Sequence, residues 1–126
     1  GLSPVAAIAR VLNKTRRTLQ DMSVIEINEA FAAQTLACTR VMSSKILMDK
    51  FFSSYNLGNA HGEISESQLN PNGGAVAIGH PVGVSGLRLI ITALKELGRR
   101  DTEQALVSAC IGGGQANAMI LERSRS

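Results

Sequence analysis

Stretches with helical and with strand-like apolar spacing alternate along this 126-residue chain, and their order restricts the fold more than any other feature. The order is helix, strand, helix, strand, helix and then two strands. The four strands are expected at residues 24–27, 75–78, 105–110 and 116–123. Such alternation is typical of a mostly parallel sheet covered by helices, and the last two strands, joined by a glycine turn, add an antiparallel pair. We therefore predict one α/β domain over residues 1–126, with a mixed, mostly parallel sheet.

The three helices are identified by apolar residues that recur on one face and by residues typical of helix ends. Ser3 and Pro4 open the first helix as N-cap and first-turn proline. Its buried face is expected to consist of Val5, Ile8, Ala9 and Leu12. A second, alanine-rich helix is expected over residues 29–41, and a third begins near Ser85 and ends at Gly98 as C-cap.

Residues 43–68 fit none of these elements. They contain a short helix candidate at residues 46–52, followed by polar, turn-like sequence in which His61 is expected to lie in an exposed loop. We interpret this stretch as an atypical surface excursion from the domain.

The composition excludes several classes of protein. With 44% hydrophobic residues, no tryptophan and three phenylalanines, the chain can bury a core of aliphatic side chains. No apolar run is long enough to span a membrane, and no secretory signal opens the sequence. Cys38 and Cys110 lack zinc or disulfide-scaffold spacing, so we expect no metal site and an intracellular protein. The cytoplasm is the expected compartment, with a mitochondrial or peroxisomal location left open.

The net charge of +3 is accompanied by two basic clusters, at residues 14–17 and 99–100. Such clusters occur in proteins that bind nucleic acid or phosphorylated ligands. They also occur as solvated helix ends, and here no aromatic residues are interleaved with them. We therefore expect no nucleic-acid partner.

Three side chains that can take part in chemistry follow or end predicted strands: Asn28, His80 and Cys110. In a parallel sheet such positions collect at one edge, where ligands commonly bind. Taken singly, each has an ordinary alternative, because Asn28 could cap the next helix, His80 could lie on the surface and Cys110 could be a core residue. Glu29 is interpreted as a favourable charge at the start of the second helix.

A thiolate, an imidazole and an amide-held water can together move a proton and stabilise an oxyanion, which is the chemistry of acyl transfer through a carbanion. Three segments resemble signature blocks of the thiolases, in the same order: NEAFAAQ (28–34), GGAVAIGHPVGVSG (73–86) and CIGGGQ (110–115). The opening GLSPVAAIARVL resembles the helix that precedes the first block. The resemblance covers nearly the whole chain except residues 43–68, and it implies the C-terminal half of the thiolase fold.

The resemblance also implies substrates and roles. Thiolases interconvert two acyl-CoA molecules with a 3-ketoacyl-CoA and free CoA, so the substrates would be CoA thioesters, with no separate cofactor. Asn28 would hold a catalytic water, and this water with His80 would form the oxyanion hole for the thioester enolate. Cys110 would move the α-proton as acid and base, and the Gly112 amide would contribute to a second oxyanion hole. The pocket near the acyl group would be lined by Ala30, Phe31 and Ile111.

One part of the thiolase machinery has no counterpart in this sequence. The acylated nucleophile of thiolases is a cysteine of the first half of the protein, and neither Cys38 nor Cys110 matches its motif. We expect the chain to act with a thiolase N-terminal half, in cis or in trans, and to form a homo-oligomer. The alternatives are a non-catalytic half-thiolase that serves as an interaction module, and a relative in another CoA-condensing family. Cys38 is interpreted as a buried, inert helix residue.

Overall fold

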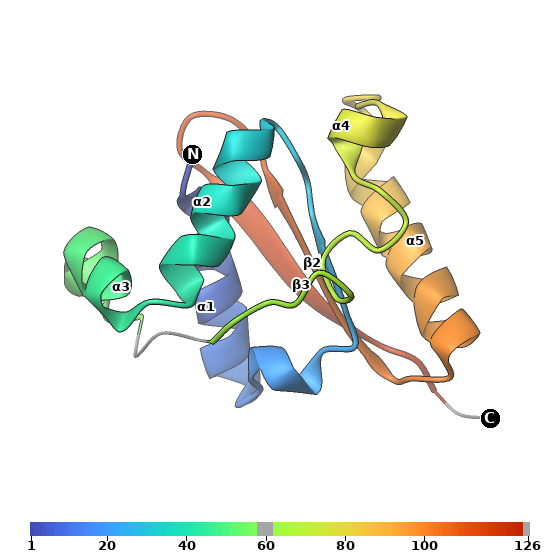
Figure 1. The fold of residues 1–126 in the computed structure, drawn as a ribbon, viewed down its shortest axis with the longest axis horizontal. Helices are drawn as coiled ribbons and strands as arrows, with labels where there is room; N and C mark the ends of the chain where they lie inside the picture. Colours follow the sequence, from blue (N-terminus) through green and yellow to red (C-terminus); the bar gives the residue numbers. More distant parts are fainter. Residues whose placement is uncertain (58–61, 125–126) are drawn as a thin grey trace.

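A three-stranded sheet runs through the middle of the molecule, with helices on both of its faces (Figure 1). The computed structural model describes residues 1–57 and 62–124, and His61 lies outside the described residues. The strands follow the order β1-β2-β3 and span Val24–Ile27, Gln104–Cys110 and Ala116–Glu122. β1 is parallel to β2, and β2 is antiparallel to β3. The predicted α/β fold with a mixed sheet is confirmed.

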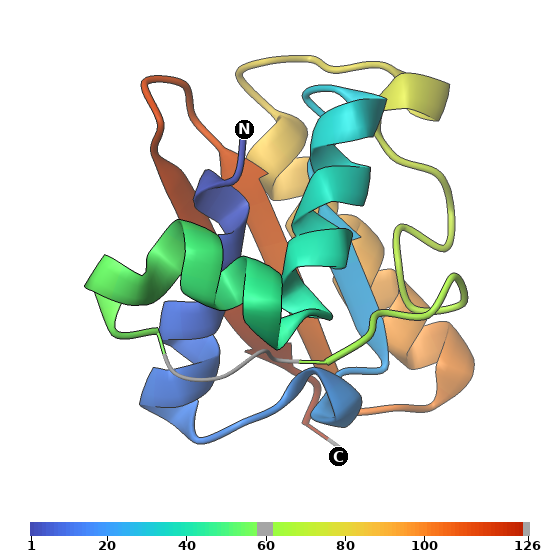
Figure 2. The ribbon, with the colours of Figure 1, turned by 60° about the vertical axis from the view of Figure 1, so that its left-hand side comes forward.

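The register of the strands determines where the chain leaves the sheet. β1 pairs with β2 as far as Ile27, which lies opposite Ser108. β2 continues to Cys110, opposite Ala116 of β3. Because parallel strands end at the same edge of a sheet, the segments that follow β1 and β2 both lie at the top of the molecule in Figure 2.

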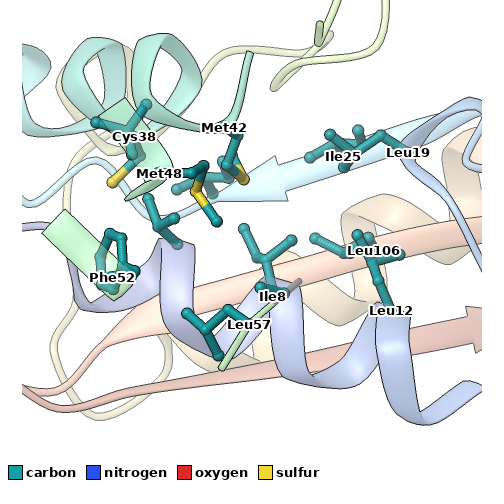
Figure 3. Packing of buried hydrophobic residues seen from close by; sticks show 14 of the residues in the cluster. Ile8, Leu12, Leu19, Ile25, Cys38, Met42, Met48, Phe52, Leu57 and Leu106 are labelled. Carbon is teal, nitrogen blue, oxygen red and sulfur yellow. The ribbon is translucent and has the colours of Figure 1, made fainter. Parts of the chain in front are cut away.

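One face of the sheet is covered by the helices α1 (Ser3–Thr15), α2 (Ala32–Met42) and α3 (Lys45–Phe52) (Figures 1 and 2). The residues predicted to form the buried side of α1 are fully buried: Val5, Ile8, Ala9 and Leu12. They belong to a cluster with Ile25, Ile27 and Leu106 of the sheet and with side chains of α2 and α3 (Figure 3). Removal of this aliphatic surface from water is the main force that holds the helices on the sheet.

Residues 43–68 contribute to this core as well as to the surface. The short helix expected there is α3, and the Ser44 side chain caps it by accepting a hydrogen bond from the Leu47 N–H. A 3₁₀ turn, Ser53–Tyr55, follows. Within the described part of this stretch, three side chains are buried in the cluster: Met48, Phe52 and Leu57.

The other face of the sheet is covered by α5 (Ser85–Arg100). This helix passes Gly98, so the prediction that it ends there is wrong, and its cap is Asp101, which adopts a left-handed conformation with φ of 53°. The Asp101 N–H donates to the Gly98 carbonyl. Arg99 and Arg100 extend the helix because both pair with Glu96, one turn earlier.

α2 begins three residues later than predicted. Residues 28–31 form a loop, in which the Ala30 N–H donates to the Asn28 carbonyl and Phe31 is extended, with φ of −145° and ψ of 144°. The prediction that Glu29 lies at the start of α2 is therefore wrong. Its carboxylate is directed instead at the segment that leads to His80.

Residues 75–78 form a single helical turn, α4 (Ala75–Ile78), in place of the predicted strand. The N–H groups of Ala77 and Ile78 both donate to the Gly74 carbonyl. The position beside β1 where a further strand could pair is taken by Leu69, which forms a parallel bridge to Ile25. A run of four apolar residues carries too little periodicity to distinguish these outcomes from sequence.

Candidate active site

A pocket of about 740 Å³ opens at the edge of the sheet where β1 and β2 end. Its wall includes residues of the segments that follow β1, α4 and β2, together with the start of α1. Every site residue predicted from the sequence lines it: Asn28, Ala30, Phe31, His80, Cys110, Ile111 and Gly112. The fold therefore brings to one hollow groups that are far apart in the chain.

Asn28 continues β1 by one residue and ends in the pocket wall. Its N–H donates to the Ser108 carbonyl at 2.8 Å, which fixes its backbone to β2. The side chain is buried, and its Oδ1 has no hydrogen-bond partner among the described residues. Because a buried amide oxygen without a protein partner is usually satisfied by water, this site fits a held water molecule. Asn28 does not cap α2, which begins at Ala32.

His80 lies in the loop between α4 and α5, with its ring against Ser85. The Nδ1 atom of His80 is 2.7 Å from the Ser85 Oγ, and this hydroxyl also lies 3.0 Å from the Pro81 carbonyl, to which it can donate. Ser85 is buried at the first residue of α5, so it holds the imidazole in a fixed orientation. The Nε2 atom makes no hydrogen bond to any described residue and is free for a ligand.

Cys110 ends β2 and is half-buried, with a free thiol. The turn that follows has three consecutive left-handed residues, Gly112, Gly113 and Gly114, with φ of 81°, 57° and 74°. Such a run requires glycine, because a Cβ atom strains this conformation. The turn is closed by the Gln115 N–H, which donates to the Gly112 carbonyl at 3.0 Å.

The remaining predicted residues provide apolar surface. Phe31 and Ile111 are 75% and 60% exposed, and both line the pocket. Large apolar side chains left open in a hollow are typical of a surface that a ligand or a partner covers.

Two site residues were not identified from the sequence. Gln34 lines the pocket, is buried, and has an Oε1 atom without a partner in the described part of the chain. Its Nε2 donates to the Cys38 Sγ at 3.5 Å. Ser85, interpreted only as a helix-start residue, contacts His80. Their only sequence signals are the place of Gln34 at the end of NEAFAAQ and that of Ser85 at the start of a helix.

Cys38 is fully buried in α2 beneath the pocket, as expected. Burial raises the pKa of its thiol above the ordinary value, and the hydrogen bond from Gln34 opposes this in part. A thiol with a raised pKa is a poor nucleophile at neutral pH, which agrees with an inert residue.

Comparison with known proteins bears on this geometry. Residues 1–123 match the family model "Thiolase, C-terminal domain". The chain is 46% identical over 123 residues to a beta-ketoadipyl-CoA thiolase of Acinetobacter baylyi and 42% identical to an acetyl-CoA acetyltransferase of Cupriavidus necator. Each alignment covers 98% of this chain and 26% of the relative.

A solved structure agrees with these relatives. The human mitochondrial 3-ketoacyl-CoA thiolase, crystallised in complex with CoA, superposes with a TM-score of 0.75 at 41% identity, over 98% of this chain and 26% of that one. The chain thus spans about a quarter of the length of the relatives it matches. In residues 1–57 and 62–124, no helix is long and apolar enough to cross a membrane. The family match and these identities show that the chain belongs to the thiolase family and carries its C-terminal domain.

Proposed function

We propose that this chain supplies the oxyanion-stabilising and proton-transferring groups of a thiolase-type acyl transfer between CoA thioesters. The observation that carries the proposal is the convergence of Asn28, His80 and Cys110 on one pocket. The named activities of the relatives, beta-ketoadipyl-CoA thiolase and acetyl-CoA acetyltransferase, support the substrate class. The CoA bound to the human relative supports it as well.

The oxyanion hole for the enolate would consist of His80 and a water held by the Asn28 amide. His80 would donate from Nε2, since Nδ1 is engaged by Ser85. This requires a proton on Nε2, which is present when the Ser85 hydroxyl turns from Pro81 to donate to Nδ1, or when the ring is doubly protonated. Fixed donors aimed at the developing negative charge lower the barrier without reorganising during the reaction.

Cys110 would be the acid and base. As a thiolate it takes the α-proton of an acyl-CoA, and the electron pair of the C–H bond passes to the thioester oxygen. The enolate carbon then attacks the carbonyl of the acyl donor, whose C–S bond breaks and releases the donor's thiolate. In thiolysis the thiol returns the proton to the α-carbon. The Gly112 N–H makes no hydrogen bond to the described residues, and we assign it to the tetrahedral intermediate.

The acyl donor would be a thioester on a cysteine of a thiolase N-terminal half, in cis or in trans. An apolar stripe on the outer side of α5, formed by Leu87, Ile91 and Leu94, supports a partner, because 41–57% of each residue is exposed. The same stripe supports self-association, so the isolated chain should elute as an oligomer or aggregate in size-exclusion chromatography. A stable monomer would contradict that part of the proposal.

The test is thiolysis of acetoacetyl-CoA by the chain alone and by the chain supplied with a nucleophile-bearing N-terminal half, fused or added. We expect activity only in the second case, and its loss in Cys110→Ser and His80→Ala. Cys38→Ala is the matched control, since Cys38 is buried outside the pocket, and it should retain activity within about threefold. Activity that survives both Cys110→Ser and His80→Ala would refute the assignments.

The non-catalytic alternative predicts a different result in the same assay. A chain that binds the N-terminal half tightly, but whose complex shows no thiolysis and no exchange of the α-proton, would be an interaction module. Exchange of the α-proton without thiolysis, if it is lost in Cys110→Ser, would still support Cys110 as the base.

A further inference from the structure

Glu29, the residue after Asn28, connects the two separate segments of the oxyanion site. Its Oε1 accepts a hydrogen bond from the Asn70 side-chain amide at 3.0 Å, and its Oε2 accepts one from the Val76 backbone N–H at 2.9 Å. Val76 belongs to α4, which ends two residues before His80. One half-buried carboxylate thus contacts Asn70, which pairs with the end of β1, and the segment that leads to the imidazole.

Asn70 is itself fixed to β1. Its side chain accepts from the Ile27 N–H at 2.9 Å and donates to the Ile27 carbonyl at 3.0 Å, so that it pairs with the strand as another strand would. Its own N–H donates to the Ile25 carbonyl. The residue is buried and left-handed, with φ of 43°, a conformation that asparagine tolerates better than most residues. The amide that holds Glu29 is therefore part of the sheet edge.

The far end of α4 is also held. The Arg88 guanidinium on α5 donates to the Gly79 carbonyl at 2.6 Å, directly before His80. His80 then contacts Ser85 through Nδ1. Hydrogen bonds thus run from β1 through Asn70 and Glu29 to α4, while Arg88 and Ser85 of α5 hold the Gly79 carbonyl and the imidazole.

We propose that Glu29 is a positioning residue, which sets the distance between Asn28 and His80 and so the width of the oxyanion hole. The inference rests on the proposed function and concerns the same site. Displacement of one donor by about 1 Å is enough to lower a rate by about 100-fold, so a contact that fixes this spacing affects catalysis without touching substrate.

Gly74 provides independent support for this role. Its backbone has φ of −100° and ψ of −166°, which any residue can adopt. A Cβ atom built there overlaps the carboxylate of Glu29, and all three of its closest neighbours are atoms of that group. The glycine is required by the bound carboxylate and not by the backbone. Alanine at residue 74 should therefore displace Glu29, and should be harmless once the carboxylate has been removed.

The contact between Gly74 and Glu29 can be tested by a double-mutant cycle in the thiolysis assay with the N-terminal half supplied. We expect Glu29→Ala and Gly74→Ala each to lower kcat by about 10- to 100-fold, with KM for acetoacetyl-CoA within about threefold. The double variant should be no slower than Glu29→Ala, because both changes break the same contact. Glu29→Gln retains one acceptor oxygen and should recover part of the activity. Glu66→Ala, at an exposed glutamate, is the matched control and should change nothing.

Two measurements on the isolated chain separate positioning from loss of stability. The Val76 amide should exchange with solvent faster in Glu29→Ala and Gly74→Ala, since it loses its acceptor. The melting temperature of Glu29→Ala is then compared with that of a variant whose kcat is normal. A positioning role requires that the two melting temperatures fall by similar amounts while only Glu29→Ala loses kcat.

The outcomes distinguish this inference from the proposed function. If Cys110→Ser and His80→Ala retain activity, the proposed function fails. If they abolish it while Glu29→Ala keeps kcat within threefold, or the losses in the double variant multiply, the positioning role of Glu29 is refuted.

Discussion

The two faces of the sheet are built differently. The face under α1, α2 and α3 carries a continuous cluster of apolar side chains (Figure 3). The face under α5 carries a smaller one: Val24, Leu89, Ala93, Leu97, Ala105 and Val107. On that second face β1 also buries Glu26, which is 1% exposed and whose Oε1 lacks a partner among the described residues. The first side is closed mainly by apolar packing, whereas the second also buries the ionisable side chains of Glu26 and Glu96.

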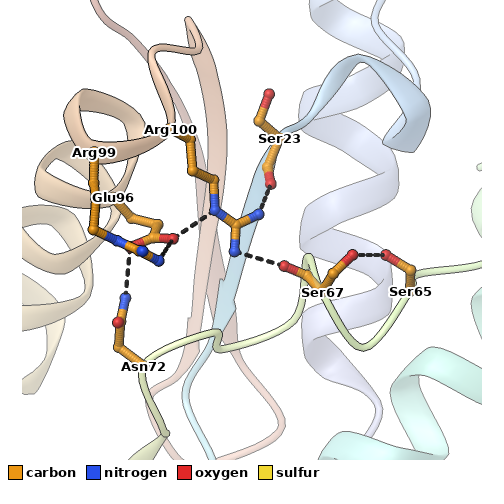
Figure 4. A network of polar contacts seen from close by, with 7 residues as sticks. All are labelled: Ser23, Ser65, Ser67, Asn72, Glu96, Arg99 and Arg100. Carbon is orange, nitrogen blue, oxygen red and sulfur yellow. Dashed lines mark hydrogen bonds and ion pairs between the residues drawn. The ribbon is translucent and has the colours of Figure 1, made fainter.

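On the α5 side, polar contacts add to the stabilisation that the smaller apolar cluster provides. Glu96 accepts hydrogen bonds from Arg99, Arg100 and the Asn72 amide (Figure 4). Arg100 also donates to the carbonyls of Ser23 and Ser67, which connects the end of α5 to the start of β1 and to the segment before Asn70. α5 is therefore held at one end by the hydrogen bonds around Glu96 and Arg100, while its end near His80 depends on the contacts of Arg88 and Ser85.

The largest expected effect compares one leucine on each face. Leu12→Ala in α1 removes a side chain with no exposure from the large cluster and should lower the free energy of unfolding by about 3–4 kcal/mol. Leu89→Ala in α5 removes one that borders an open hollow and should cost about 2–3 kcal/mol. Urea unfolding of both variants measures the difference. An equal or larger loss at Leu89 would contradict the proposed difference between the faces.

Glu26 should make the α5 face sensitive to pH. Burial, and then the nearby charges of Glu29 and Glu96, raise its pKa from 4.5 to about 7. The native state therefore holds a proton that the unfolded state has lost, and stability falls as pH rises from 4.5 through 7. Glu26→Gln should remove this slope and raise the free energy of unfolding at pH 8 by about 1–3 kcal/mol. Parallel stability curves for variant and parent would contradict this.

Glu96 lies on the same face and should show the opposite slope. Hydrogen bonds, first of all from Arg99 and then from Asn72 and Arg100, lower its pKa to about 2. Its stabilising contribution is present above pH 4.5 and is lost as the pH falls toward 2. Glu96→Gln should cost about 1–2 kcal/mol at pH 7 and less at pH 3, measured by urea unfolding. A cost that is constant between these pH values would mean that the charge has no part in these hydrogen bonds.

Features determined by neighbouring residues could be predicted from the sequence, whereas features determined by contacts between distant segments could not. The buried face of α1 could be predicted because four apolar residues at helical spacing encode it locally. α4 and the start of α2 could not, because both depend on contacts between distant segments. Leu69 fills the place beside β1, and the Glu29 carboxylate binds the segment of residues 70–76.

The candidate site follows the same rule. That Asn28 and Cys110 would meet could be inferred from strands ending at one edge, and His80 joins them although it follows a helical turn and not a strand. The contact of Ser85 with the imidazole is a tertiary feature with no local signature, and so is the Gln34 oxygen, which lacks a partner in the described part of the chain. The chemical roles of these residues remain predictions, which the variants described above can test.

The smallest expected effect concerns α3, on the densely packed side. Lys45 and Asp49 form an ion pair of 2.6 Å one turn apart, and their side chains are 63% and 56% exposed. An exposed pair at this spacing contributes about 0.3–0.5 kcal/mol, because water screens it and ordering two side chains costs entropy. Asp49→Asn should therefore lower the free energy of unfolding by less than about 0.5 kcal/mol, and 1 M salt should abolish the difference. A loss above about 1 kcal/mol would show that charge also stabilises this face, and the contrast between the two sides of the sheet would fail at α3.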